Sequence, residues 1–331
     1  MIKQVKNRRA LRLHYIFYIC IYTVNRIYLT PYNYTYGTVN NPMFSRKFSS
    51  TLMILAIVAM VAVVLGCTSP SPSPVTGSAT PAPLSGAVTV TGSTSVGPYA
   101  EELALMFDAK NNNQTNTQVS QVGSGPGITA TIQGTTDIGM SSRNLTANET
   151  AQGLVTYKIC DDGIAIIVNN ANPVSDLSID QIRDIYAANV TNWNKVGGSD
   201  AQIVVVQRES GSGTRDGFET LAMANKKVNV TTSAITQTST GAVITYVSNN
   251  PNAIGYASFG DITSAVKALK VGGVAPSVAT IKDKSYVLQR PFLFVTKGQP
   301  TKPAAKAFID YVLGPEGRAF LASKNLVPVT S

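Results

Sequence analysis

Histidine is almost absent from this chain of 331 residues: the only one is His14. Beyond the first 47 residues, a serine nucleophile therefore has no histidine to act as its base, and a metal ion has no imidazole ligand. None of the loop serines at positions 95, 124 and 212 sits in a Gly-x-Ser-x-Gly elbow. We therefore expect a binding protein rather than a hydrolase, with no catalytic residue, no metal and no cofactor.

Cysteine is scarce as well, with Cys20, Cys67 and Cys160 as the three examples. If the chain is cleaved before Cys67, as argued below, the folded part keeps Cys160 alone, which excludes a disulfide and a cysteine metal site. Cys160 follows Ile159 in an apolar context, and we expect it to be a buried apolar residue rather than a reactive thiol.

Negative charge is missing from the first 47 residues, which hold eight of the 27 basic residues and no Asp or Glu. Without them the chain has 19 basic and 18 acidic residues, so the net charge of +9 belongs almost entirely to this leader. The basic composition therefore gives no support to nucleic-acid binding.

The leader contains the pattern of a lipoprotein signal peptide at residues 43–67. Met43–Lys47 is a short basic segment, and Leu52–Gly66 is a continuous apolar run that ends at Cys67. The run is shorter than the roughly 20 residues that a spanning helix prefers. We expect Met43 to be the true start, residues 1–42 to be a spurious extension, and Cys67 to carry a lipid anchor. An uncleaved signal anchor is the alternative, and either places the folded part on the outer face of the cell membrane.

Residues 68–85 are rich in Ser, Pro, Thr, Ala and Gly and carry no charge. Such a segment buries too little apolar surface to fold, so we expect an extended spacer. The remaining 246 residues, 86–331, suffice for two α/β domains of ordinary size.

Three loops rich in glycine and hydroxyl groups each follow a strand-like segment and precede a helix-like one. They are Gly92–Pro98, Gly123–Ile128 and Arg208–Thr214. Glycines let backbone N–H groups approach a ligand, a helix N-terminus favours anions, and an arginine adds a planar set of donors. This pattern predicts a site for a small oxyanion. The glycine spacing does not match a dinucleotide fingerprint.

Strand-like and helix-like segments alternate through the rest of the chain, which favours mainly parallel sheets flanked by helices. We predict strands at residues 87–91, 117–122, 135–139, 163–168, 203–206 and 286–295. The predicted helices cover residues 98–110, 126–133, 178–187, 215–223, 240–249 and 303–313.

Two further segments, Asp137–Arg143 and Asn252–Ala257, accompany the three loops. In these five segments and their order along the chain, the protein resembles the phosphate-binding, periplasmic-type substrate-binding proteins of ABC phosphate importers. The resemblance implies a class II periplasmic-binding-protein-like fold of two α/β domains, with the ligand in the interdomain cleft. Domain 1 would be residues 86–161 plus 252–331 and domain 2 residues 162–251, with hinges near Asp161–Gly163 and Asn252–Gly255. The implied anion-binding residues are Ser93, Thr94, Ser95, Ser124, Ser142, Arg143, Arg208, Ser212, Gly213 and Thr214.

The resemblance further implies a monomer that closes around inorganic phosphate and delivers it to permease and ATPase subunits. One departure concerns selectivity. Well-known members have a carboxylate near the segment matching Ser141–Arg143, which accepts the proton of hydrogen phosphate and so excludes sulfate, whereas here the segment reads Ser-Ser-Arg. Glu209, Asp161 and Asp162 are the candidate replacements. A receptor for another tetrahedral oxyanion such as sulfate, or an anchored surface module without transport, remain the alternatives.

Overall fold

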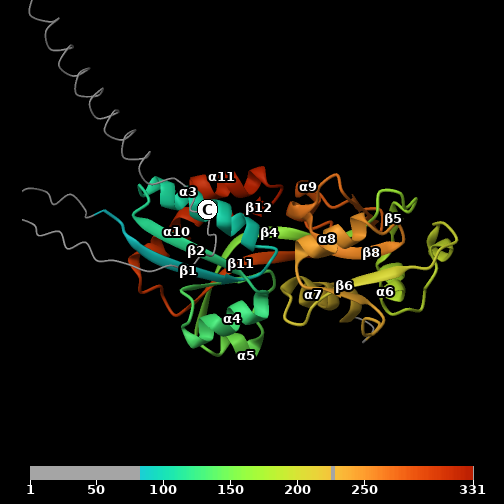
Figure 1. Ribbon diagram of the computed structural model, residues 1–331, viewed down its shortest axis with the longest axis horizontal. Helices are drawn as coiled ribbons and strands as arrows, with labels where there is room; N and C mark the ends of the chain where they lie inside the picture. The colour runs from blue at the N-terminus through green and yellow to red at the C-terminus, as the bar shows by residue number, and fades with distance from the viewer. Residues whose placement is uncertain (1–82, 225–227, 331) are drawn as a thin grey trace, which may run out of the picture. The chain divides into compact units, whose positions relative to one another are not determined.

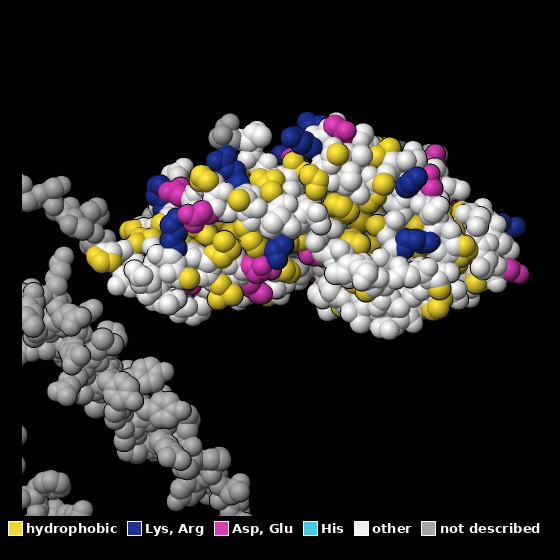
Figure 2. Space-filling view, turned by 90° about the horizontal axis from the view of Figure 1, so that it is seen from above, with side chains coloured by type: hydrophobic (Ala, Val, Ile, Leu, Met, Phe, Trp, Pro, Cys, Tyr) yellow, Lys and Arg dark blue, Asp and Glu magenta, His cyan; other side chains and the backbone are white. Residues whose placement is uncertain are grey.

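The computed structural model describes residues 83–224 and 228–330. The predicted signal peptide, Cys67 and nearly all of the spacer lie outside the described residues. Within the described part, no helix is both long and apolar enough to cross a membrane. Charged side chains of both signs are interspersed with hydrophobic ones on the face shown in Figure 2, as the balanced charge of residues 86–331 predicts.

Six of the nine α-helices in the described residues lie close to the predicted positions. The nine helices are α3 (Gly97–Lys110), α4 (Ser124–Gln133), α5 (Ala147–Thr150), α6 (Ile179–Tyr186), α7 (Gly213–Phe218), α8 (Thr240–Ser248), α9 (Val278–Lys282), α10 (Pro303–Leu313) and α11 (Pro315–Ser323). Of these, α5, α9 and α11 were not predicted. Shorter helical turns are η1 (Trp193–Val196), the π-helical η2 (Glu219–Met223) that continues α7, and η4 (Phe259–Asp261).

One mixed sheet connects most strands, in the order β2-β1-β3-β11-β4-β8-β6-β7, and β9 and β12 also pair with β4. The strands are β1 (Gly86–Gly92), β2 (Thr115–Gln121), β3 (Ile138–Ser141), β4 (Leu154–Val168), β5 (Asp176–Leu177), β6 (Val204–Arg208), β7 (Ile235–Gln237), β8 (Ala253–Ser258), β9 (Lys267–Ala268), β10 (Lys270–Val271), β11 (Gln289–Lys297) and β12 (Val327–Pro328).

The sheet is less parallel than predicted, because its two long central strands run against their neighbours. Strand β1 pairs in parallel with β2 and β3, and β6 with β7 and β8. Strand β4 is antiparallel to both β11 and β8, and β11 is antiparallel to β3. The predicted strand at 163–168 is thus the second half of a longer strand. The α/β class of the fold is confirmed.

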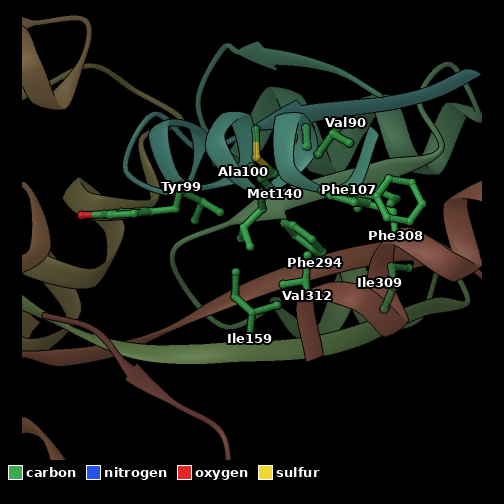
Figure 3. Packing of buried hydrophobic residues seen from close by; sticks show 14 of the residues in the cluster. Val90, Tyr99, Ala100, Phe107, Met140, Ile159, Phe294, Phe308, Ile309 and Val312 are labelled. Atoms are coloured by element: carbon green, nitrogen blue, oxygen red, sulfur yellow. The ribbon is translucent and has the colours of Figure 1, made fainter. Parts of the chain in front are cut away.

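The described hydrophobic residues form four buried clusters in two lobes, and the larger cluster of each lobe is its main core. The first core joins β1, α3, β11, α10 and α11, and it includes Cys160, which is buried as predicted. Figure 3 shows Phe107, Phe294, Phe308 and their neighbours interdigitating there. The second core contains residues from Ile164 to Leu288. We call residues 83–162 and 289–330 the first lobe, and residues 163–288 the second lobe.

Strands β4 and β11 connect the lobes (Figure 1). Residues 154–163 of β4 pair with β11, whereas Ile164–Val168 pair with β8. Strand β4 thus changes its partner between Gly163 and Ile164, beside the segment Asp161–Gly163 that the resemblance gives as the first hinge. The resemblance gives the second crossing as Asn252–Gly255, but these residues lie in or directly before β8, and Ile254 of β8 belongs to the second core. The chain passes from the second core to the first between Leu288 and Phe292. The packing of the cores thus favours a later boundary than residue 252.

Candidate anion-binding site

The loop between β1 and α3 buries three hydroxyl residues, because Gly92 lets the chain turn closely over β3. Gly92 has a φ of +149°, and a Cβ there would lie 2.2 Å from the Met140 carbonyl oxygen. The Ser93 N–H donates to that oxygen at 3.0 Å. Ser93 Oγ accepts from the N–H groups of Ser95 and Val96 at 3.2 and 3.3 Å, so this hydroxyl shapes the loop. Thr94 and Ser95 direct their hydroxyls to the second lobe instead.

The start of α4 brings Ser124 to the end of β3. Gly127 allows this helix to lie against β1, since a Cβ there would be 2.4 Å from Gly92 Cα. The Ser142 N–H donates to Ser124 Oγ at 3.1 Å, and the two serine hydroxyl oxygens are 3.3 Å apart. Both side chains are buried. Two of the predicted first-lobe residues are thus adjacent.

Arg208, at the end of β6, is 1% exposed and extends from the second lobe toward the first. Its Nη2 donates to Thr94 Oγ1 at 2.9 Å, and its Nη1 donates to Thr240 Oγ1 at 3.1 Å. Glu209 holds the guanidinium by accepting from Nε and Nη2, each at 2.7 Å. A buried arginine is therefore fixed in direction by a carboxylate and aimed at hydroxyls of both lobes.

Hydroxyl groups also meet directly between the lobes. Ser95 Oγ lies 2.9 Å from Thr214 Oγ1 and 2.9 Å from Thr240 Oγ1. Thr94 Oγ1 lies 3.4 Å from Thr240 Oγ1. The predicted residues Thr94, Ser95, Arg208 and Thr214 are thus brought together around one point.

The loop before α7 touches the start of α4. Gly211 adopts a φ of +85°, and its carbonyl oxygen accepts from the Gly125 N–H at 2.9 Å. Ser212 is the N-cap of α7 and accepts from the Arg215 N–H at 3.3 Å. Gly213 lies so close to the first lobe that a Cβ would be 2.3 Å from Ser124 Oγ and 2.7 Å from Ser142 Oγ. The predicted Ser124, Ser142, Ser212 and Gly213 therefore form one contact region.

Arg290 is a second buried guanidinium that the sequence reasoning missed. It stands on β11 opposite Asp162 on β4, and donates to Asp162 Oδ2 from Nε at 3.1 Å and from Nη2 at 3.0 Å. Its Nη1 donates to Thr214 Oγ1 at 2.7 Å. Burial raises the pKa of the Asp162 carboxyl, while Arg290 opposes that shift. This buried ion pair lies where the chain first crosses between the lobes.

Thr240 was missed too, although the sequence contains a signal for it. Ser239-Thr240-Gly241 follows β7 and opens α8, as the recognised hydroxyl and glycine loops open α3, α4 and α7. For Arg290, the signal is a single charged residue within the mainly apolar segment Tyr286–Val295.

Arg143 differs from the sequence-based prediction. Its Nη1 and Nη2 bind Glu149 at 2.8 Å each, its Nε donates to Asp216 at 2.7 Å, and Nη1 also donates to the Asn144 carbonyl oxygen. Because four of its five N–H hydrogens have protein acceptors, this geometry gives no support to Arg143 as an anion donor. It joins the lobes through Asp216. The hydrogen bonds from Arg143 lower the pKa of Glu149 to about 2.

The three carboxylates considered as acceptors for a phosphate proton are all bound to cations. Glu209 holds Arg208, Asp161 contacts Lys158 at 2.7 Å, and Asp162 holds Arg290. Among the described residues, the hydrogen bonds of Thr94, Ser95, Ser124, Ser142, Thr214 and Thr240 involve no carboxylate. Residues 83–224 and 228–330 also hold no group of three or more His, Cys, Asp or Glu that could bind a metal. Neutral hydroxyls and paired guanidiniums suit a desolvated oxyanion, because each of its oxygens can receive a hydrogen bond.

The chain is similar to known proteins along most of its described length. A family model described as a PBP superfamily domain matches residues 77–316. The phosphate-binding protein PstS of Bacillus subtilis (strain 168) is 30% identical over 250 residues, which cover 74% of this chain and 82% of that protein. PstS 2 of Streptococcus agalactiae is 42% identical over 138 residues, covering 40% of this chain and 47% of that protein.

Two solved structures have the same fold. A Clostridium perfringens protein, described as a phosphate ABC transporter substrate-binding protein with bound phosphate, is 40% identical, with a TM-score of 0.72, over 74% of this chain and 100% of that one. An ABC-type phosphate transport receptor from Vibrio cholerae is 34% identical, with a TM-score of 0.63, over 73% of this chain and 100% of that one.

Proposed function

The chain belongs to the PBP superfamily, within the family of phosphate-binding substrate-binding proteins of ABC importers, and on this basis we propose that it binds inorganic phosphate and delivers it to a membrane importer. Binding takes place outside the cytoplasm, and the bound anion passes to permease and ATPase subunits. The protein acts as a receptor and not as an enzyme.

The observation that carries this proposal is the position of Arg208. Its guanidinium is buried, is held by Glu209, and bonds to Thr94 in the first lobe and Thr240 in the second. A phosphate among these groups would replace the contacts that the hydroxyls make with one another. Each lobe supplies donors that the other lacks, so the anion stabilises the closed arrangement.

The proposed anion-binding set contains seven predicted residues together with Thr240. It is Thr94, Ser95, Ser124, Ser142, Arg208, Gly213, Thr214 and Thr240, with Ser212 positioning the loop as the N-cap of α7. Ser93 shapes its own loop, and Arg143 connects the lobes. Arg290 supports Thr214 from behind the site.

The cellular location forms a separate part of the proposal. The sequence of residues 43–67 supports export and lipid attachment at Cys67, and residues 68–85 would hold the receptor away from the membrane.

Calorimetric titration of the full chain with phosphate and with sulfate tests the binding function. We expect micromolar or tighter binding of phosphate, and a loss of about 30-fold or more in Arg208→Ala, because removing one partner of a buried charge pair typically costs 2–5 kcal/mol. Arg318→Ala on α11 is the matched control and should bind as the unaltered chain does. Binding of neither anion would refute the receptor function, whereas tighter binding of sulfate would favour a receptor for another oxyanion.

A further inference from the structure

Most hydroxyl oxygens of the site accept a hydrogen bond from a neighbouring N–H group, of a side chain or of the backbone. An arginine side chain donates hydrogen bonds and accepts none. Arg208 therefore donates to Thr94 Oγ1 and Thr240 Oγ1, and Arg290 donates to Thr214 Oγ1. Each of these threonine oxygens has a lone pair engaged by a cation, so its own hydrogen must point elsewhere. Each of the three threonines therefore keeps a hydroxyl hydrogen that it can donate toward the space between the lobes.

Two serine hydroxyl oxygens in these loops each accept a hydrogen bond from a backbone N–H group. Ser124 Oγ accepts from the Ser142 N–H, and Ser212 Oγ accepts from the Arg215 N–H. Their hydroxyl hydrogens are free to be donated to an anion.

Ser95 differs from these residues. Its hydroxyl is completely buried, and its side-chain hydrogen bonds are with Thr214 Oγ1 and Thr240 Oγ1, each at 2.9 Å. No N–H group among the described residues donates to Ser95 Oγ. Its lone pairs therefore face hydroxyls that can turn to an anion instead, and its own hydrogen can point in either direction.

Resting on the proposed function, we propose that Ser95 Oγ is the acceptor for the proton of a bound hydrogen phosphate. When the anion takes the hydrogens of Thr214 and Thr240, the lone pairs of Ser95 become available to a P–O–H group. A hydroxyl can also rotate and donate, so a sulfate oxygen at the same place would meet a donor rather than a fixed negative charge. The site should therefore prefer phosphate to sulfate only modestly and should accept singly and doubly protonated phosphate.

Ser142 is the one competing hydroxyl, since its Oγ also receives no N–H donor. Its hydroxyl contact is Ser124 Oγ at 3.3 Å, which is a weaker interaction than either contact of Ser95. Both hydroxyl partners of Ser95 accept a hydrogen bond from a buried guanidinium, whereas the hydroxyl partner of Ser142, Ser124, accepts none.

The test compares phosphate and sulfate affinities of the full chain at pH 6 and pH 8 by calorimetry. Ser95→Ala leaves the P–O–H hydrogen unpaired, so the affinity for phosphate should fall about 10- to 100-fold. Sulfate loses only one hydroxyl donor, so the affinity for sulfate should fall less than about fivefold. Thr240→Val removes a hydroxyl that can donate to either anion, and it should weaken the binding of both by a similar factor.

Three outcomes would overturn the role of Ser95: equal losses for the two anions in Ser95→Ala, a phosphate-selective loss in Ser142→Ala instead, or more than 100-fold preference for phosphate in the unaltered chain. These failures leave the receptor function standing, provided that the unaltered chain binds phosphate.

Discussion

Tyr99 donates a hydrogen bond from its hydroxyl to Asp261 Oδ1 at 2.7 Å, which joins α3 of the first lobe to η4 of the second. Figure 3 shows the Tyr99 side chain extending away from the first core, with its oxygen at the far end. Burial of Asp261 raises its pKa to about 7, and its Oδ2 is buried without a hydrogen-bond partner. Burial also raises the pKa of Tyr99, so this hydroxyl stays a donor.

This pair predicts a specific dependence of stability on pH. The folded chain holds the Asp261 proton up to about pH 7, whereas the unfolded chain releases it near the ordinary value of 3.8. Stability from this group therefore falls as the pH rises from about 4 to about 7, and the unfavourable contribution is complete above pH 7. Asp261→Asn should raise the melting temperature at pH 8 by several degrees and change it little at pH 4.5.

Asp200→Asn, which alters an exposed carboxylate, is the control for this comparison and should leave both melting temperatures almost unchanged. A melting temperature that falls at pH 8 in Asp261→Asn would show that the ionised carboxylate stabilises the fold, which contradicts the prediction.

Glu149 should have the opposite dependence. Its pKa is lowered to about 2 by Arg143, so its contribution to stability is complete above about pH 4.5 and is lost as the pH falls toward 2. Glu149→Gln should therefore reduce the free energy of unfolding at pH 7 by about 1–3 kcal/mol, the range for a group that loses a charged hydrogen-bond partner. Urea denaturation at pH 7 and pH 3 measures this, and the difference from the unaltered chain should shrink at pH 3. An equal difference at both values would mean that packing, and not charge, explains the loss.

Much of the site could be predicted from the sequence because its signals are local. The loops 92–98, 123–128 and 208–214 each place glycine and hydroxyl groups where a strand ends and a helix begins, and the structure brings all three together. Thr240 and Arg290 were not predicted from the sequence, because their contacts are with distant residues. Thr240 is 145 positions from Ser95, and Arg290 is 128 positions from Asp162. The contacts of Arg143 could not be predicted for the same reason, since Asp216, 73 positions away, and nearby Glu149 decide where its guanidinium points.

The fold shows the same limit. The first half of β4 mixes polar and apolar residues, and it is a strand because β11 pairs with it along nine positions. The resemblance gives Asn252–Gly255 as a crossover, yet Ala253–Gly255 begin β8, which is completely buried between β4 and β6. Pairing between distant strands, which no local pattern reports, determines both.

The ion pair of Asp162 and Arg290 should be strongly coupled. Asp162→Asn or Arg290→Met alone leaves the other charge buried without a partner, which typically costs about 3–5 kcal/mol. The double variant removes both charges and should lose clearly less than the sum of the single losses in urea denaturation. A double-mutant cycle with additive losses would show that the two residues act independently. Arg290→Met should also weaken phosphate binding, because Thr214 loses the donor that directs its hydroxyl.

Membrane attachment depends on a single atom in the proposal. Cys67→Ala removes the thiol that would carry the lipid, so the protein should be released from membranes or retain its uncleaved leader. Fractionation of cells and the mass of the recovered chain measure this, with Cys160→Ala as the control that leaves the attachment site intact. Unchanged membrane association together with an unchanged mass would remove Cys67 as the anchor.

Gly213 provides the most direct test of closure, because it separates the contact between lobes from the folding of either lobe. A methyl group at this position would lie 2.3 Å from Ser124 Oγ and 2.9 Å from Ser124 Cβ, and a serine side chain is too short to move aside without its backbone. Gly213→Ala should therefore hold the lobes apart and lower phosphate affinity at least about 100-fold, while the melting temperature without phosphate changes by only a few degrees. Gly241→Ala is the matched control: it also lies near the start of a helix beside a site residue, but a Cβ there meets nothing within 4 Å. If Gly213→Ala bound phosphate as tightly as Gly241→Ala, the anion would not require the lobes to meet at this point.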